Sequence, residues 1–506
     1  MNKEESIMKF KKMWLNINGA NRMFACNPEK DSLADVLRRM GLTGTKVGCN
    51  VGVCGSCSVI LNGKLTRACT KKMRNLDDYS KVITIEGIGQ PNNLHPLQAA
   101  WIVAGAVQCG FCTPGFIVSS YALLLENNNP TREEVREWFH KNKNVCRCTG
   151  YVQIVDAVMM AAAVMRGEKT IEDFSLGHQE DGEYYGKPIT RPTALAKVCG
   201  LADYGDDQEL KMPAETLKVA MVQPKVAHHA RIIRIDTSEA EKMPGVERII
   251  TAKDIKEAGG TNIMAEGHFF ERTTLTVPTR HVLCEDKIFR YGDVVALVCA
   301  DTKDHAREAA AKVKVEIEQL PEYLSYLDAV MPDAQRIHPS TPNIFAQQPV
   351  LKGVGLEEPS KVAELIDSSE YSVEGSFYST REPHLSIEGD SVQAYFDEDG
   401  MLAIQCKSQG IYSSIGRIGN SVGIAKDRIR IIMNPTGASF GWSTNAGDLC
   451  LAAAAAYITK KPIALSMSYE EHQHFSGKRR PCHSNGRAAC DKDGKLVAVE
   501  FDYGMD

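Results

Sequence analysis

Residues 49–57 read CNVGVCGSC, and a further cysteine, Cys69, lies on the next expected hairpin. Four residues separate Cys49 from Cys54, and two separate Cys54 from Cys57, which is the spacing of plant-type [2Fe–2S] sites. Three of the four thiolates come from one loop, so that loop must wrap closely around the cluster. Its glycines permit positive φ and let backbone N–H groups approach sulfur. The segment therefore predicts a [2Fe–2S] cluster with Cys49, Cys54, Cys57 and Cys69 as ligands.

Buried structural thiols and a zinc site are the alternatives for these four cysteines. Zinc accepts four thiolate ligands as well. Zinc sites more often combine two C-x2-C pairs, and this stretch contains only one. The spacing therefore favours iron.

A second group of cysteines comprises Cys109-Gly-Phe-Cys112 and Cys146-Arg-Cys148. Each pair lies where an expected helix begins or ends, so two interhelical turns could bring four thiolates together at one end of a helical bundle. Helix N-termini at that end would favour an anionic cluster. The pattern predicts a second [2Fe–2S] cluster, and a thioredoxin-like redox pair is the alternative for Cys109 and Cys112. No βαβ pattern surrounds that pair.

The regions around these motifs differ in their hydrophobic period. Residues 12–86 predict short strands around one helix, with hairpin turns at Asn18-Gly19 and Asn62-Gly63. Residues 95–165 have helical spacing and predict a four-helix bundle, in which Thr131 opens a capping box. Residues 166–192 are polar and aperiodic, as in a linker. From 192 onward, strand-like and helical patterns alternate.

Bulk composition describes a soluble globular protein of roughly three or four domains. The chain has 506 residues, of which 43% are hydrophobic and 24% charged. A net charge of −5 provides no basic surplus for a nucleic-acid partner. Apolar runs are too short to span a membrane and the start lacks the apolar region of a secretory signal, so we expect a cytoplasmic protein. Eight further cysteines are scattered singly, as core residues often are.

Several strings resemble successive signatures of the molybdenum hydroxylase (xanthine oxidase) family, and most closely those of flavin-free bacterial aldehyde oxidoreductases. They are CNVGVCGSCSV (49–59), IEGIGQPNNLHPLQAAW (85–101), QCGFCTPG (108–115), CRCTGY (146–151) and RPTALAKVCGLADYGDD (191–207). The resemblance implies an α+β multidomain protein that matches the N-terminal half of the family. Its expected parts are a ferredoxin-like β-grasp [2Fe–2S] domain (1–88), a four-helix [2Fe–2S] bundle (89–166), a linker (167–191), an α/β hammerhead domain (192–335) and an incomplete molybdopterin-binding domain (345–506).

The resemblance also implies contacts to a molybdopterin cofactor, in its cytosine dinucleotide form. In the family the helical cluster lies nearest the pterin, and Gln108 and Cys148 match positions that touch it. The string NPTGASFGW (434–442) resembles a glycine-rich loop near the metal; Gly437, Phe440 and Gly441 match, while Ala438 replaces a glycine. By itself this string is an ordinary turn.

Two further stretches resemble family segments with less specificity. REPHLSIE (381–388) resembles a stretch on the active-site side, but Gly389 stands where proline is usual, and Glu388 could equally be structural. GKRRP (477–481) resembles a family turn.

The sequence predicts neither an FAD domain nor a nicotinamide site, and this determines the expected electron path. Only about forty residues separate Cys148 from Thr193, too few for the FAD domain of xanthine dehydrogenases. No G-x-G-x-x-G follows a strand, so no nicotinamide site is expected. Electrons would leave to a ferredoxin or flavodoxin.

The leading hypothesis is a component of an enzyme that hydroxylates an aldehyde to a carboxylic acid with water, relaying electrons through both clusters. Family members of this layout continue well beyond this length, into the region that carries the catalytic base. We therefore assign no catalytic residue, and expect either a fragment or a second chain that supplies the remainder, with a homodimer when complete. Alternatives are an iron–sulfur electron-transfer subunit without catalysis, a xanthine or N-heterocycle hydroxylase component, and a zinc-stapled interaction protein.

Overall fold

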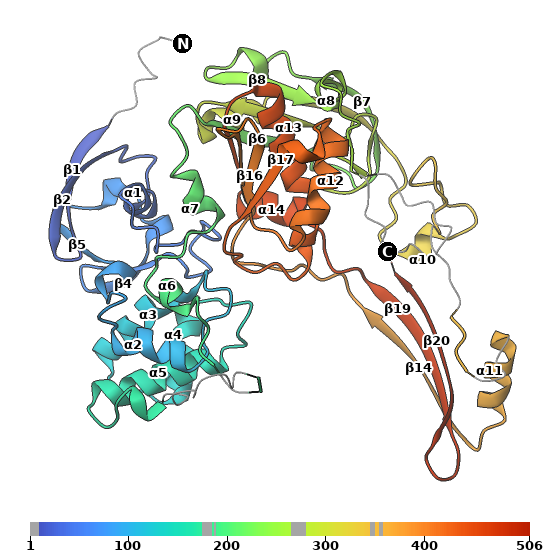
Figure 1. Ribbon diagram of the computed structural model, residues 1–506, viewed down its shortest axis with the longest axis horizontal. Coiled ribbons are helices and arrows are strands. Elements are labelled where there is room, and N and C mark those ends of the chain that lie inside the picture. Colours follow the sequence, from blue (N-terminus) through green and yellow to red (C-terminus); the bar gives the residue numbers. More distant parts are fainter. Residues whose placement is uncertain are drawn as a thin grey trace.

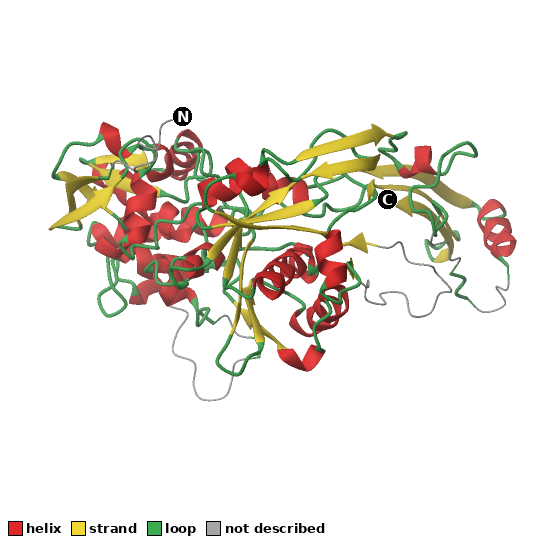
Figure 2. Ribbon diagram, turned by 90° about the horizontal axis from the view of Figure 1, so that it is seen from above, coloured by secondary structure: helices red, strands yellow, loops and turns green. Residues whose placement is uncertain are grey.

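The computed structural model describes residues 10–174, 185–186, 189–264, 280–344, 350–353 and 358–505. Figure 1 shows three parts along the long axis: a blue and teal part with a small sheet and a helical bundle, a central body around a mixed sheet, and a long three-stranded arm. Seen from above in Figure 2, the small sheet and bundle lie at one end and α11 at the other. Helices and sheets occur in all of these regions, which confirms the predicted α+β class.

The small N-terminal sheet forms as its turn signals predict. It has the order β2-β1-β5-β3-β4, with β1 (Lys11–Ile17), β2 (Ala20–Cys26), β3 (Ser58–Leu61), β4 (Lys64–Arg67) and β5 (Ser80–Ile83). Asn18 and Asn62 adopt positive φ at the two hairpin turns, a conformation that asparagine tolerates better than most residues. Ser32 caps α1 (Leu33–Arg39), whose Leu33 and Leu37 are buried in the core of this sheet.

The four-helix bundle also agrees with its prediction. It consists of α2 (Pro96–Val103), α3 (Thr113–Glu126), α4 (Arg132–Lys141) and α5 (Val152–Met165). The capping box of Thr131 with Glu134 starts α4, because each side chain satisfies a backbone N–H that has no partner within the helix. Trp101 and Phe116 are buried between the helices.

A seven-stranded sheet forms the central body and joins two segments that the sequence patterns treat separately. Its order is β17 (Ile429–Met433), β16 (Leu402–Cys406), β15 (Ser391–Phe396), β18 (Ile463–Ser466), β6 (Leu217–Val222), β12 (Ala296–Ala300) and β8 (Val246–Thr251). β18 pairs in parallel with β6, so the predicted hammerhead and molybdopterin regions share one sheet. Both strands are almost entirely buried, and pairing satisfies backbone groups that an exposed edge would leave open.

Smaller sheets and helices complete the body and arm. The strands are β7 (Ala230–Asp236), β9 (Ile263–Met264), β10 (Arg280–His281), β11 (Lys287–Ile288), β13 (Lys314–Gln319), β14 (Tyr371–Ser379), β19 (Cys482–Cys490) and β20 (Leu496–Met505). The helices are α6 (Ala194–Val198), α7 (Gly205–Glu209), α8 (Ala252–Glu257), α9 (Lys303–Ala310), α10 (Tyr326–Ala329), α11 (Pro359–Asp367), α12 (Ile411–Val422), α13 (Gly447–Thr459) and α14 (Tyr469–Phe475). The buried α13 packs on β15, β16 and β18 and carries much of the body's core.

Much of the predicted linker, 175–184 and 187–188, lies outside the described residues. In the ranges that the structure describes, no helix is both long and apolar enough to cross a membrane.

A buried ion-pair network holds the N-terminal sheet against the segment that carries α7. Asp207 accepts hydrogen bonds from Arg38 Nη1 at 2.7 Å and from Lys46 Nζ at 2.6 Å. The Lys46 and Asp207 side chains are each 1% exposed, and Arg38 is 7% exposed. Lys46 Nζ also donates to the Ala202 carbonyl at 2.7 Å. Asp207 thus neutralises Lys46 and shares Arg38 with Asp206, whose Oδ2 lies 3.1 Å from Arg38 Nη2.

Candidate cofactor sites

The four cysteines of the first group converge beside the N-terminal sheet, and each is at most 9% exposed. The Cys49 thiol shares a hydrogen bond with Cys54, and Cys57 shares one with Cys69. The Cys49 charge also acts on the Cys57 and Cys69 thiols, so the two pairs form one set of four. We call Cys49, Cys54, Cys57 and Cys69 the loop set.

The backbone of the loop is shaped to stabilise thiolate charge. Gly52 and Gly55 adopt positive φ, and a Cβ at Gly55 would lie 2.6 Å from Asn144 Nδ2. The N–H groups of Val51 and Val53 donate to Cys49 Sγ at 3.5 and 3.3 Å. The hydrogen bond from Cys54, together with these N–H groups, lowers the pKa of Cys49 to about 5 although burial opposes this. These donors favour the anionic form that an iron ligand needs.

The second group of cysteines converges at the start of two bundle helices. Cys109 and Cys148 share a hydrogen bond, and so do Cys112 and Cys146. A hydrogen bond between the Cys146 and Cys148 thiols links the two pairs. Cys112 is the N-cap of α3, and the second pair lies just before α5. We call these four residues the bundle set; as predicted, the two turns bring them together where helix N-termini favour negative charge.

The two sets lie next to each other. Phe111 and Tyr204 pack edge-on, with ring centroids 5.2 Å apart, in a small buried cluster that also includes Cys49 and Cys54. Tyr204 Oη donates to the Cys109 carbonyl at 2.8 Å. The aromatic pair therefore packs against residues of both sets.

The loop that contains NPTGASFGW follows β17 and is held by a buried carboxylate. Gly437 N–H donates to Glu388 Oε2 at 2.5 Å, and Gly205 N–H donates to Glu388 Oε1 at 3.2 Å. Ala438, the departure from the expected glycine, adopts φ 76°, a conformation that glycine reaches without strain. Phe440 also has positive φ, and its ring is half exposed.

One arginine that the sequence motifs did not single out connects the bundle set with this loop. Arg147 lies between Cys146 and Cys148, and its guanidinium carbon is 5.7 Å from the centroid of the Phe440 ring. Arg147 Nε donates to the His384 carbonyl at 3.2 Å. Gln108 is exposed at the same turn as Cys109, and its carbonyl accepts hydrogen bonds from Arg191 and Lys197, both at 3.0 Å. The structure thus places the motif around Cys148 beside the predicted cofactor loop.

Further charged groups lie behind the loop and were also missed from the sequence. Lys407 Nζ is 3.0 Å from Asp390 Oδ1 and 4.0 Å from Glu388 Oε2. Trp442 Nε1 donates to Asp390 Oδ2 at 2.7 Å, and His472 Nδ1 is 3.0 Å from the same oxygen. Burial opposes ionisation of Asp390, but His472 and Lys407 outweigh it and hold its pKa below the usual range.

Burial raises the pKa of Glu388 to about 7, although Lys407 and the two backbone N–H groups act in the opposite direction. Below pH 4.5 both the folded and unfolded states hold this proton. Between about pH 4.5 and 7 only the folded state holds it, so the free energy of unfolding falls as pH rises through this window. Glu388→Gln removes this titration. We expect the stability difference, wild type minus variant, to fall by about 3 kcal/mol between pH 4.5 and 8 in urea unfolding; a difference that is flat with pH contradicts the assignment.

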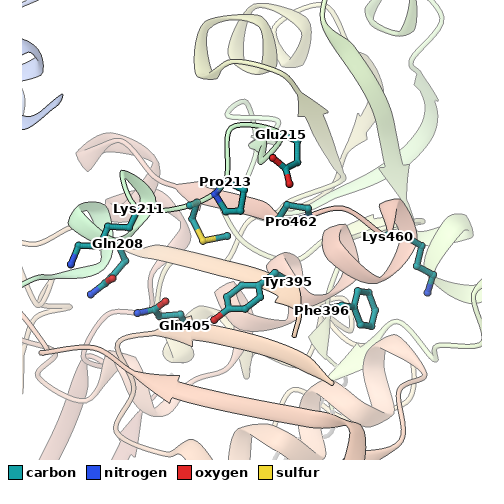
Figure 3. A pocket seen from close by; sticks show the side chains of 10 residues that line it. Gln208, Lys211, Pro213, Glu215, Tyr395, Phe396, Gln405, Lys460 and Pro462 are labelled. Atoms are coloured by element: carbon teal, nitrogen blue, oxygen red, sulfur yellow. The ribbon is translucent and has the colours of Figure 1, made fainter. Parts of the chain in front are cut away.

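A cavity of about 400 Å³ lies elsewhere, between the segment after α7 and the ends of β15 and β16. Figure 3 shows its lining, which includes Tyr395, Phe396 and Lys460. None of the predicted site residues lines it.

Within the described ranges, no three His, Cys, Asp or Glu side chains are grouped as a site for a single metal ion. All sixteen cysteines are free of disulfides. A two-iron cluster spreads four thiolates around two metals and their bridging sulfides, and the residues present fit that donor chemistry: each set contains four thiols, and N–H or hydroxyl donors point at sulfur in both.

Four family models match successive parts of the chain. They are a 2Fe-2S iron-sulfur cluster binding domain (15–79), a [2Fe-2S] binding domain (84–159), an aldehyde oxidase and xanthine dehydrogenase a/b hammerhead domain (199–321) and a molybdopterin cofactor-binding domain (337–506). The chain therefore contains two [2Fe–2S]-binding domains and a molybdopterin-binding domain.

Relatives match either the whole chain or parts of it. The aldehyde oxidoreductase of Megalodesulfovibrio gigas is 46% identical over 500 residues, which are 97% of this chain and 53% of the relative. The small FeS subunit of nicotinate dehydrogenase from Eubacterium barkeri is 44% identical over 148 residues, which are 29% of this chain and 92% of that subunit. A solved structure of aldehyde oxidoreductase from Desulfovibrio gigas superposes with a TM-score of 0.91 at 46% identity, over 98% of this chain and 54% of that one. The chain thus spans about half the length of the aldehyde oxidoreductases that it matches.

Proposed function

Because the chain belongs to the molybdenum hydroxylase (xanthine oxidase) family, we propose that it forms part of an oxidoreductase that converts an aldehyde to a carboxylic acid with water. Support comes from the 46% identity to an aldehyde oxidoreductase across 97% of the chain. The observation that carries the proposal is the convergence of two adjacent sets of four cysteines beside the loop at Gly437. The molybdenum cofactor, when bound, supplies two-electron oxidation of the substrate, and each [2Fe–2S] cluster carries one electron at a time.

The residues of this chain have distinct proposed roles. The loop set and the bundle set each hold one cluster. Gln108, Cys148, Gly437, Phe440 and Gly441 contact the molybdopterin, in its cytosine dinucleotide form. Glu388 is a positioning residue, since its carboxyl fixes the backbone at Gly437. No catalytic base is proposed within this chain.

The electron path and partners follow from the same layout. The loop set passes electrons to an external ferredoxin or flavodoxin, without FAD. The rest of the molybdopterin region comes from further polypeptide, in this chain's longer form or in a second chain, and the complete enzyme is a cytoplasmic homodimer. We propose the domain extents 1–88, 89–166, 192–335 and 345–506, with 167–191 as linker.

A second candidate function is an iron–sulfur electron-transfer subunit without catalysis of its own. The match to the nicotinate dehydrogenase small FeS subunit favours it, because in that enzyme the matching 148 residues form a separate subunit. A xanthine or N-heterocycle hydroxylase component has weaker support, from partial matches to xanthine dehydrogenases.

Metal analysis and reduction of the clusters by substrate test these functions. The chain is purified anaerobically together with the polypeptide that supplies the rest of the molybdopterin region. Molybdenum and iron in this preparation, with visible absorption that bleaches on addition of an aldehyde, support aldehyde oxidation. Iron without molybdenum and no response to aldehyde favours the electron-transfer subunit. Zinc without iron contradicts both.

A further inference from the structure

One face of the arm formed by β14, β19 and β20 is apolar across all three strands. The antiparallel registers align side chains in rows that point to the same side of the sheet. These rows are Val373–Ala488–Val499, Gly375–Gly486–Phe501, Phe377–Ser484–Tyr503 and Ser379–Cys482–Met505. Figure 1 shows the sheet extending away from the central body.

The large side chains of this face are open to solvent. Their exposed fractions range from 44% for Met505 to 70% for Val373. The members of what we call the arm face are Tyr371, Val373, Phe377, Val499, Phe501, Tyr503 and Met505. Contiguous apolar surface of this extent on a soluble protein marks an interaction site.

The opposite face of the same sheet is partly covered by a helix and carries charged side chains. There α11 buries Ile366 against Ala489 and Ala498. Arg487 on that face forms ion pairs with Asp367 and with Glu500. Among the described residues, α11 therefore covers part of the opposite face, whereas the large side chains of the arm face are open to solvent.

Two glycines leave room on the arm face for aromatic rings to lie close to the sheet. A Cβ at Gly486 would meet the Phe501 ring at 3.4 Å, and one at Gly375 would meet the Phe377 ring at 3.3 Å. The Phe501 and Tyr503 rings lie 5.7 Å apart. Aromatic side chains that are already ordered lose little entropy when a partner covers them.

We propose that the arm face binds the section of the aldehyde oxidoreductase relatives that has no counterpart in this chain; the inference rests on the proposed function. All three arm strands lie within the molybdopterin-binding match, 337–506. This chain accounts for 53% of the Megalodesulfovibrio gigas relative, so a section of similar length remains. The family also distributes its parts over separate chains, since the nicotinate dehydrogenase of Eubacterium barkeri has a small FeS subunit and a large molybdopterin subunit that match different shares of this chain.

Co-purification tests this inference. The unmatched section of the Megalodesulfovibrio gigas relative is produced as a tagged chain together with this 506-residue chain. The double variant Val373→Glu/Phe377→Glu places two charges on the arm face. The matched control, Ser372→Glu/Ser376→Glu, places the same charges on the opposite face of the same strand. We expect capture of the wild type and the control, and about tenfold or more weaker capture of the arm-face variant.

The substituted residues are exposed, so both variants should fold, and circular dichroism checks this. Failure of the wild type to be captured, or equal capture of both variants, overturns the inference. Light scattering of the chain alone tests whether a second copy of this chain covers the arm face instead. If the wild type is a dimer and the arm-face variant is a monomer, the face binds a second copy and the inference is overturned. Iron content of the same samples separates the two proposals, because iron-loaded protein without capture contradicts only the docking, whereas iron-free protein contradicts the proposed function.

Discussion

Cys54→Ser is expected to remove about half of the iron from the purified chain, together with about half of its visible absorption. Cys54 shares a hydrogen bond with Cys49 inside the loop set, and a two-iron cluster needs four thiolates from that set. Serine keeps the side-chain size but does not ionise at neutral pH. The bundle set remains intact, so the second cluster should persist. Iron per chain and the visible spectrum are measured on anaerobically purified protein.

Two further variants make this result specific. Cys112→Ser should remove the other half of the iron, because Cys112 belongs to the bundle set. Cys490→Ser should leave the iron unchanged, since Cys490 lies on the arm, outside both sets. If Cys54→Ser retains all of its iron, the assignment of the loop set is wrong.

Asp207→Asn is expected to lower the free energy of unfolding by about 3–5 kcal/mol, because the substitution leaves the buried Lys46 ammonium without a counter-charge. Arg38 keeps its ion pair with Asp206 at 3.1 Å. Arg38 and Lys46 both lie within 2.7 Å of the Asp207 carboxylate and have almost no access to water. Urea unfolding measures the loss. We expect the N-terminal sheet to separate from the α7 segment early in that transition.

An exposed ion pair between the N-terminal domain and α9 supplies the control. Lys30 and Asp304 are paired at 3.0 Å, but their side chains are 62% and 60% exposed. Lys30→Ala should therefore cost less than about 1 kcal/mol. Equal effects of the two substitutions would show that burial of the Asp207 network does not determine its contribution.

The parts of the fold that the sequence predicted are those set by local rules. Asn18-Gly19 marks a hairpin, and Thr131 with Glu134 marks a helix start, because each signal lies within a few residues of the structure it specifies. The pairing of β6 with β18 was not predicted. Nearly 250 residues separate these strands, and a buried strand carries no pattern that identifies its neighbour.

The same distinction applies to the candidate sites. Cysteine spacing predicted which thiols would converge. In the loop set three ligands come from one short loop, and in the bundle set two come from each of two short turns. Arg147 gave no signal beyond its position between two cysteines, and its contact with Phe440 depends on how two domains pack. Glu388 remained ambiguous because its partners, at Gly205 and Gly437, come from distant segments.

Electron paramagnetic resonance of the anaerobically purified chain after dithionite reduction tests the central claim most directly. With two clusters in different surroundings, one in the loop set and one in the bundle set, we predict two distinguishable signals, each from one reduced two-iron centre per chain. A colourless protein without either signal, loaded with zinc in place of iron, would contradict the assignment of both sets.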